Sequence, residues 1–143
     1  MPSTRDDFEH WLFEMDDRLE EFVGVLPTDI SSKMDYSAES LSVLEGWLMT
    51  QYESVNDILK ESEKPMLDMV TRYVGETLRK NLGGVWNIDL KNKKNVFYRM
   101  PVIEKQGSWT ECPVTLVTAS TDRRNGSFIA GVLNSIARRY GTA

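Results

Sequence analysis

The sequence predicts a single α+β domain in which amphipathic helices come first, an antiparallel sheet follows and a helix ends the chain. The chain has 143 residues, of which 41% are hydrophobic, as expected for one globular domain spanning residues 1–143. Apolar residues recur at three- and four-residue steps as far as Leu82, and the period then changes to the alternation typical of strands. Helices and strands that occupy separate parts of a chain favour an α+β fold over alternating βαβ units.

Amphipathic periodicity predicts three helices in the first part of the chain, over residues 4–24, 38–53 and 65–82. Ser3 or Thr4 can cap the first helix, and Ser37 can cap the second. The glycine pair 83–84 ends the third. Residues 54–63 fit either an extension of the second helix or a short turn of their own.

Alternating apolar and polar residues predict strands over 85–90 and 95–100, which form an antiparallel hairpin around a polar turn. A short further piece at 102–103 and a loop over 104–111 follow. A segment rich in β-branched residues predicts a third strand over 113–118. The apolar stripe of residues 127–140 predicts the last helix, which Gly141 closes.

The charge of the chain is distributed unevenly. Residues 1–63 hold 4 Lys and Arg against 16 Asp and Glu, a net charge of −12, and residues 64–143 hold 13 against 6, a net charge of +7. Either the two halves attract each other or are merely solvated, or an acidic face steers a basic partner. The candidate partner-binding residues are the acidic side chains of the first helix: Glu9, Glu14, Asp16, Asp17, Glu20 and Glu21.

The sequence contains no recognisable catalytic or metal-binding pattern. The only histidine, His10, has a single carboxylate, Glu14, at helical spacing, and this pair does not make a transition-metal site. The only cysteine, Cys112, favours a buried structural role over that of a nucleophile, because no second cysteine or nearby histidine assists it. We therefore expect a protein that is not an enzyme and holds no metal or cofactor.

The location expected from the sequence is the cytoplasm. A single cysteine cannot form an internal disulfide, and the polar, acidic N-terminus lacks the basic start and apolar stretch of a secretory signal. No apolar run approaches the roughly 20 residues needed to cross a bilayer.

Basic residues surround the predicted hairpin and are interleaved with Phe97 and Tyr98. A surface that stacks nucleic-acid bases would have this composition, but a soluble turn is the simpler interpretation. The acidic first half also repels phosphates, so we expect no nucleic-acid partner. The basic residues are Lys91, Lys93, Lys94, Arg99 and Lys105.

A glycine inside the third predicted helix indicates a close approach by another part of the chain. Gly75 weakens the helix, and such a residue often marks a packing contact. We expect Trp86 to fold back over the gap at Gly75, with Glu76 available for its indole N–H. Glu76 has two possible roles, one structural and one in binding a ligand or partner.

The spacing Tyr73-x-Gly75-Glu76-x-Leu78, followed by Gly84-x-Trp86, resembles a pattern of small uncharacterised bacterial α+β proteins. Several of those proteins look like immunity or bacterial conflict-system components that are encoded beside toxins. The resemblance covers roughly residues 66–103. It implies a protein that binds and neutralises a toxin domain.

Two functions are compatible with these observations. The first is a non-catalytic inhibitor, of the toxin–antitoxin or contact-dependent inhibition kind, that masks a basic toxin through its acidic face. The second is a structural or adaptor subunit that self-associates, with a homodimer as its simplest form, because four Trp and seven Met can supply an apolar interface.

Overall fold

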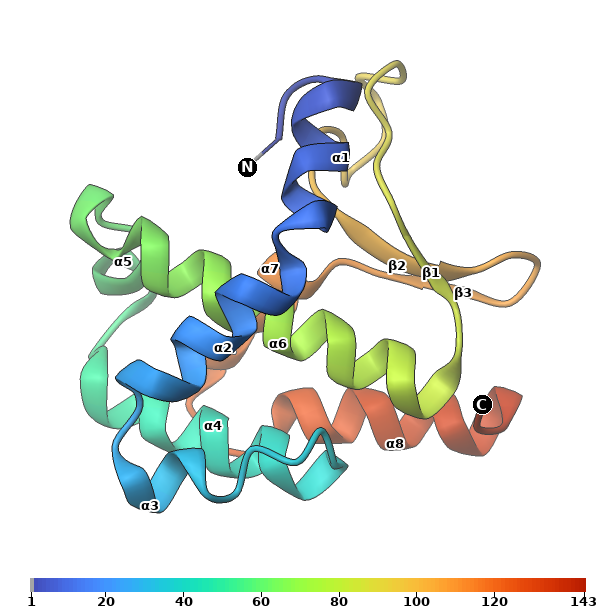
Figure 1. Ribbon diagram of the computed structural model, residues 1–143. Helices are drawn as coiled ribbons and strands as arrows, with labels where there is room; N and C mark the ends of the chain where they lie inside the picture. Colours follow the sequence, from blue (N-terminus) through green and yellow to red (C-terminus); the bar gives the residue numbers. More distant parts are fainter. Residues whose placement is uncertain (1) are drawn as a thin grey trace.

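The structure is a computed structural model that describes residues 2–143. It confirms the α+β class: a body of helices carries a small sheet, and α1 and the sheet project from one end of this body (Figure 1). None of the described helices combines the length and the apolar sequence that crossing a bilayer requires. The elements, in chain order, are α1 (Arg5–Phe13), α2 (Met15–Val25), α3 (Thr28–Ser31), α4 (Ala38–Gln51), α5 (Val55–Ile58), a 3-10 turn (Glu61–Glu63), α6 (Lys64–Leu82), β1 (Val85–Asn87), β2 (Val102–Lys105), β3 (Trp109–Glu111), α7 (Pro113–Arg123) and α8 (Phe128–Tyr140).

The N-caps predicted for the first two helical segments are confirmed. The hydroxyl groups of Thr4 and Ser37 each accept the backbone N–H three residues further on. These bonds satisfy amide groups that the first turn of a helix leaves without a partner. Residues 54–63 do not extend α4. They form a short element of their own, because a capping box at Ser54 starts α5 independently of α4.

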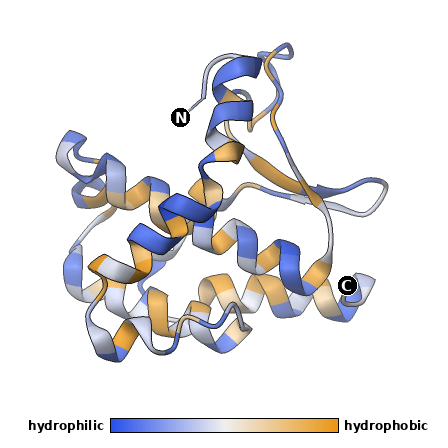
Figure 2. Ribbon diagram, viewed as in Figure 1, coloured by the Kyte–Doolittle hydropathy of each residue, from blue (hydrophilic) through white to orange (hydrophobic). Residues whose placement is uncertain are grey.

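Helix α6 lies at the centre of the molecule. Every residue from 69 to 78 is buried, and the helix contacts α2, α4, α7, α8 and β2. Polar side chains on such a helix need partners within the protein, because water does not reach them. The Tyr73 hydroxyl, for example, lies 2.7 Å from Ser40 Oγ and accepts the Tyr36 N–H at 3.0 Å. Figure 2 shows the apolar residues of the helices and of β2 that build this interior.

The sheet is antiparallel, in the order β1-β2-β3. Trp86 pairs with Ile103, and Ile103 pairs with Glu111, so these side chains share the face that packs on the helices. Val85 pairs with Glu104 on the opposite face. Because Ile103 is fully buried and Val85 is largely exposed, the sheet has one packed face and one open face.

The predicted strand over 95–100 is wrong, because this segment is a series of turns. The Asn95 side chain accepts the Phe97 N–H at 2.9 Å and donates to Asp89 at 3.0 Å. Side chains that bond nearby backbone groups in this way favour turns over strand ladders. Arg99 adopts a left-handed conformation with φ of 63°, which no regular strand contains.

A different pairing replaces the predicted hairpin. Strand β1 covers only the first half of the predicted strand 85–90, and its partner is β2, which begins directly after Pro101. The loop expected over 104–111 instead contains the end of β2 and all of β3, including Trp109. The two paired strands are therefore separated by the turns of residues 88–101, and the β1 ladder is not local in sequence.

The predicted strand over 113–118 is also wrong, because these residues form the first half of α7. Pro113 occupies the first turn, where its missing N–H removes no helical bond. The Thr115 hydroxyl donates to the Cys112 carbonyl at 2.8 Å, a bond that threonine makes readily inside helices. Burial of Val117 among the packed helices outweighs the β-propensity of the segment.

The predicted last helix is confirmed as α8, and side-chain contacts tie its start to α4. The buried Glu45 carboxylate accepts the backbone N–H groups of Phe128 at 3.0 Å and Ile129 at 2.9 Å. Arg124, which precedes the helix, donates to the Tyr52 carbonyl at 2.8 Å. A side chain of α4 thus satisfies free N–H groups at the start of α8, and the residue that caps α7 satisfies a carbonyl after the end of α4.

Candidate protein-binding surface

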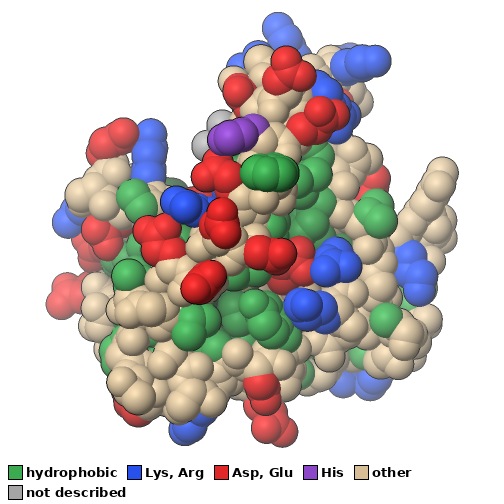
Figure 3. Space-filling model, viewed as in Figure 1, with side chains coloured by type: hydrophobic (Ala, Val, Ile, Leu, Met, Phe, Trp, Pro, Cys, Tyr) green, Lys and Arg blue, Asp and Glu red, His purple; other side chains and the backbone are tan. Residues whose placement is uncertain are grey.

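The six acidic residues proposed to bind a partner lie along α1, α2 and the junction between them. Five are exposed, and Glu14 at the junction is half-buried. Figure 3 shows acidic side chains gathered over α2. The other side of the same helices faces the core through five buried residues: Phe8, Trp11, Met15, Leu19 and Phe22. The structure therefore brings the acidic residues onto the solvent side of one helical pair.

Two of these acidic residues are paired within the helices, and four are not. Arg18 lies 3.1 Å from Glu21 and 4.0 Å from Glu14, and His10 Nε2 lies 2.9 Å from Glu14. The remaining four have no cationic side chain within 4.0 Å among the described residues. They are Glu9, Asp16, Asp17 and Glu20, which we call the open acidic group.

Among the described residues, only the Lys64–Glu61 ion pair joins the two oppositely charged halves of the chain, and these residues flank the boundary between the halves. Throughout residues 2–143, each ion pair joins side chains three or four residues apart. A weaker effect does cross between the halves: the pKa of Arg79 is raised chiefly by its hydrogen bond to Glu76, and Asp16 adds a small Coulombic contribution. The open acidic group therefore keeps its charge on the surface.

A buried arginine divides the first predicted helix in two. Arg72 of α6 is 3% exposed, and its Nη1 donates to the Trp11 carbonyl at 2.7 Å in the last turn of α1. A side chain that takes a backbone carbonyl in this way is a common cause of a helix break. Asp68 completes the cluster by accepting Arg72 Nε and Trp11 Nε1, both at 2.8 Å. The single helix expected over 4–24 is therefore two helices that meet at Glu14.

The side chain of Phe13 stands in solvent at this junction. It is 85% exposed, more than any other large hydrophobic residue of the described chain. The sequence contains a signal for this exposure: Phe13 is out of phase with the buried stripe, and Glu9, Asp16 and Asp17 stand three or four residues away.

The expected packing of Trp86 over Gly75 is confirmed. A Cβ added at Gly75 would lie 2.0 Å from Cη2 of the Trp86 ring, so the ring occupies the space that the glycine leaves. Trp86 Nε1 donates to Glu76 Oε1 at 3.1 Å, and Arg79 Nη2 donates to Glu76 Oε2 at 2.7 Å. Both carboxylate oxygens are engaged inside the protein, which supports a structural role for Glu76.

Gly84 has a comparable structural reason. Its φ of 93° is strained for other residues, and a Cβ there would lie 2.9 Å from the Glu104 carbonyl oxygen. The glycine thus lets the chain turn from α6 into β1 directly beside β2.

Neither the cysteine Cys112 nor the histidine His10 has the surroundings of a catalytic residue. Cys112 is fully buried, and this burial raises the pKa of its thiol, which disfavours the thiolate needed for attack. His10 is exposed and bonded to Glu14. Within residues 2–143, no three or more His, Cys, Asp or Glu side chains are grouped so that they could hold a metal ion.

The basic residues of the predicted hairpin lie on the 88–105 segment and are exposed. The aromatic rings between them are already engaged, because Phe97 packs against the core and the Arg99 guanidinium lies 5.2 Å from the Tyr98 ring centre. A base-stacking platform needs free ring faces. The structure gives this cluster the form of a turn-rich loop with exposed charges.

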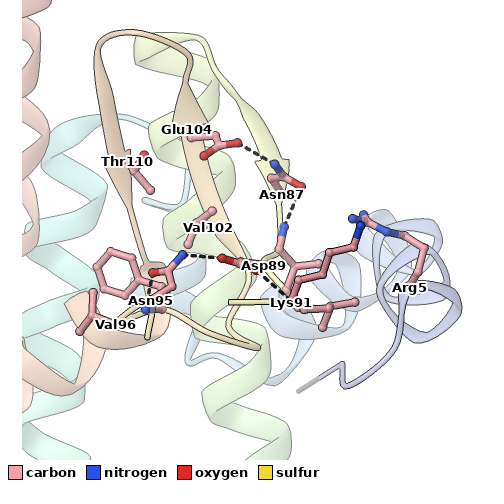
Figure 4. Close-up of a pocket in the computed structure, with 12 residues that line it drawn as sticks. Arg5, Asn87, Asp89, Lys91, Asn95, Val96, Val102, Glu104 and Thr110 are labelled. Carbon is pink, nitrogen blue, oxygen red and sulfur yellow. Dashed lines mark hydrogen bonds between the residues drawn. The ribbon is translucent and has the colours of Figure 1, made fainter. Parts of the chain in front are cut away.

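A groove of about 710 Å³ lies between this loop and the open face of the sheet (Figure 4). Two carboxylates line it, and both have internal roles. Glu104 accepts the Asn87 amide at 2.6 Å across the sheet. Asp89 accepts the backbone N–H groups of Asn92 and Lys91 and the amide of Asn95; these bonds lower its pKa and order the loop. We therefore assign these groups to the organisation of the loop.

Comparison with protein-family models, with curated proteins and with solved structures gives no significant match in any of the three cases. Among the features described above, the acidic surface of α1 and α2 with the exposed Phe13 side chain has the least part in holding the fold together.

Proposed function

We propose that this chain is a non-catalytic protein-binding module that neutralises a basic bacterial toxin domain through the acidic surface of α1 and α2. One observation carries the proposal: the open acidic group remains unpaired although the second half of the chain holds 13 Lys and Arg. Unpaired like charges on one surface repel each other, and a partner of opposite charge relieves that repulsion.

The kind of partner follows from the resemblance of the Tyr73–Trp86 region to immunity-like proteins and from the sign of the charge. A toxin that acts on nucleic acid needs a cationic active site, and an acidic inhibitor can cover such a site by charge complementarity. The interaction then needs no bond-making residue on this chain.

The test uses the product of the gene adjacent to the one that encodes this chain. That product is expressed alone in a bacterial host and then together with this chain, and growth is measured. We expect growth arrest with the product alone and recovery on co-expression. A harmless product, or arrest that co-expression leaves unchanged, would refute the proposal.

Charge-reversal variants test whether the acidic surface of α1 and α2 binds the partner. The triple variant Asp16→Lys/Asp17→Lys/Glu20→Lys should lose protection and bind the purified product at least about tenfold more weakly. The matched control Glu53→Lys/Glu61→Lys/Asp122→Lys changes the net charge equally at exposed sites on other elements. Equal loss in both variants would show that net charge, and not this surface, governs binding.

Self-association is the competing proposal, and the placement of the tryptophans weighs against it. Trp11 and Trp109 are buried in the core, and Trp47 and Trp86 pack against it. These rings are therefore committed to folding. Light scattering across a hundredfold concentration range separates the two proposals, since the binding module is expected to stay monomeric.

A further inference from the structure

The exposed Phe13 side chain is unusual in its surroundings as well as in its exposure. The buried stripe of α1 and α2 lies on the opposite side of the helical pair, and the residues spaced three and four from Phe13 are His10, Glu9, Asp16 and Asp17. A side chain that is 85% exposed contributes little to the packing of the fold. Its burial becomes favourable only when another surface covers it.

The structure anchors the backbone next to this ring. Phe13 is the last residue of α1, and the backbone there is anchored from below by Arg72, whose guanidinium bonds the Trp11 carbonyl and lies 4.2 Å from the Trp11 ring centre. Arg72 is in turn held by Asp68. A backbone that is already held in place loses little conformational freedom on binding, which favours an anchor at this position.

We propose that Phe13 is the apolar anchor of the interface and that it inserts into an apolar pocket, bordered by Lys and Arg, on the basic partner. This inference rests on the proposed function and names the recognition element within it. The open acidic group forms the charged rim around the anchor. Aromatic anchors at the centre of an interface commonly dominate its affinity, while rim charges chiefly set the association rate.

The two roles have different kinetic signatures, so the test is surface plasmon resonance against the purified product of the adjacent gene at several salt concentrations. Phe13→Ala should raise Kd by about tenfold or more through faster dissociation, with the association rate and its salt dependence unchanged. Asp16→Asn/Asp17→Asn should slow association and flatten its salt dependence. Phe13→Leu should recover part of the affinity.

Val96→Ala is the matched control, because Val96 is 77% exposed but lies on the 88–101 loop. Circular dichroism melts should show that none of these surface substitutions unfolds the protein. If Phe13→Ala binds as tightly as the unaltered chain while the double Asn variant binds more weakly, the anchor is refuted and the proposed function stands. If Phe13→Ala and Val96→Ala weaken binding equally, the anchor is also refuted. If the product does not bind at all, both proposals fail.

Discussion

Helix α6 carries two clusters of the same composition, each made of a tryptophan, a carboxylate and an arginine. In the first, Asp68 accepts the indole N–H of Trp11 and bonds to Arg72 four residues on. In the second, Glu76 accepts the indole N–H of Trp86 and bonds to Arg79 three residues on. The two clusters are in contact, because the Trp11 and Trp86 rings pack edge to face with their centres 4.9 Å apart.

The clusters differ in which charged group is buried. Arg72 is buried and Asp68 reaches the surface, whereas Glu76 is buried and Arg79 reaches the surface. A buried charge depends on its partner more than an exposed charge does, because water cannot replace the lost bond. The first cluster therefore depends on its carboxylate and anchors a helix junction, and the second depends on its arginine and anchors the sheet.

The largest effect on stability is expected at Gly75, where the Trp86 ring of the second cluster fills the space beside the backbone. Gly75→Ala places a methyl group inside the volume of the Trp86 ring and should lower the free energy of unfolding by more than about 3 kcal/mol. Urea denaturation measures this change. Gly46→Ala, in α4 with nothing near its added Cβ, is the control and should raise stability by about 0.5–1 kcal/mol. Equal effects at both glycines would refute the packing account.

Replacing the two arginines tests the comparison directly. Arg79→Met leaves the buried Glu76 carboxylate with only the Trp86 indole N–H and should lower the free energy of unfolding by about 3 kcal/mol. Arg72→Met removes the buried charge itself. It leaves the Trp11 carbonyl without its donor, but Asp68 reaches water and keeps the Trp11 indole N–H, so the loss should be about 2 kcal/mol. Urea midpoints give both values. A larger loss at Arg72 would reverse the assignment.

The loss of one indole hydrogen bond should lower the free energy of unfolding by less than the loss of one arginine. Trp11→Phe and Trp86→Phe keep an aromatic ring but remove one N–H donor to Asp68 and to Glu76, respectively. Each should lower the free energy of unfolding by about 1–2 kcal/mol, with the greater loss at Trp86, because Glu76 is the more buried acceptor. Thermal melts of the two variants, compared under one buffer, test the order.

Glu111 supplies a contrast, because it shares the packed sheet face with Trp86 but burial alone acts on its pKa and raises it. A carboxyl whose pKa is higher in the folded state makes folding less favourable as pH rises through that pKa. Glu111→Gln should therefore raise stability at pH 7 slightly and flatten its dependence on pH in the weakly acidic range. Glu61→Gln, on an exposed turn, should change neither.

Local patterns predicted the features that depend on local physics. The caps at Thr4 and Ser37, the glycine end of α6 and the contact between Gly75 and Trp86 are all readable from spacing and residue type. The secondary-structure predictions were wrong where contacts between distant parts of the chain determine the local conformation. The β-branched run after Pro113 became a helix because the interior accepts it in that form.

The junction between α1 and α2 could not be predicted from the first helix alone. Nothing between Thr4 and Gly24 breaks a helix, and the cause of the break, Arg72, lies far along the chain. Phe13 itself carried a local signal, its position out of phase with the apolar stripe. The acidic residues were correctly placed on the solvent side, because charged residues opposite such a stripe leave no other orientation.

The contacts between α4 and α8 bear on how the chain can acquire its structure during synthesis. Glu45 is completed only by the amide groups of Phe128 and Ile129, which emerge from the ribosome more than 80 residues later. Until then the nascent chain holds a carboxylate that belongs in the interior but has no backbone N–H groups to donate to it. We therefore expect the packing of Glu45 between α4 and α8 to be completed only after α8 has left the exit tunnel.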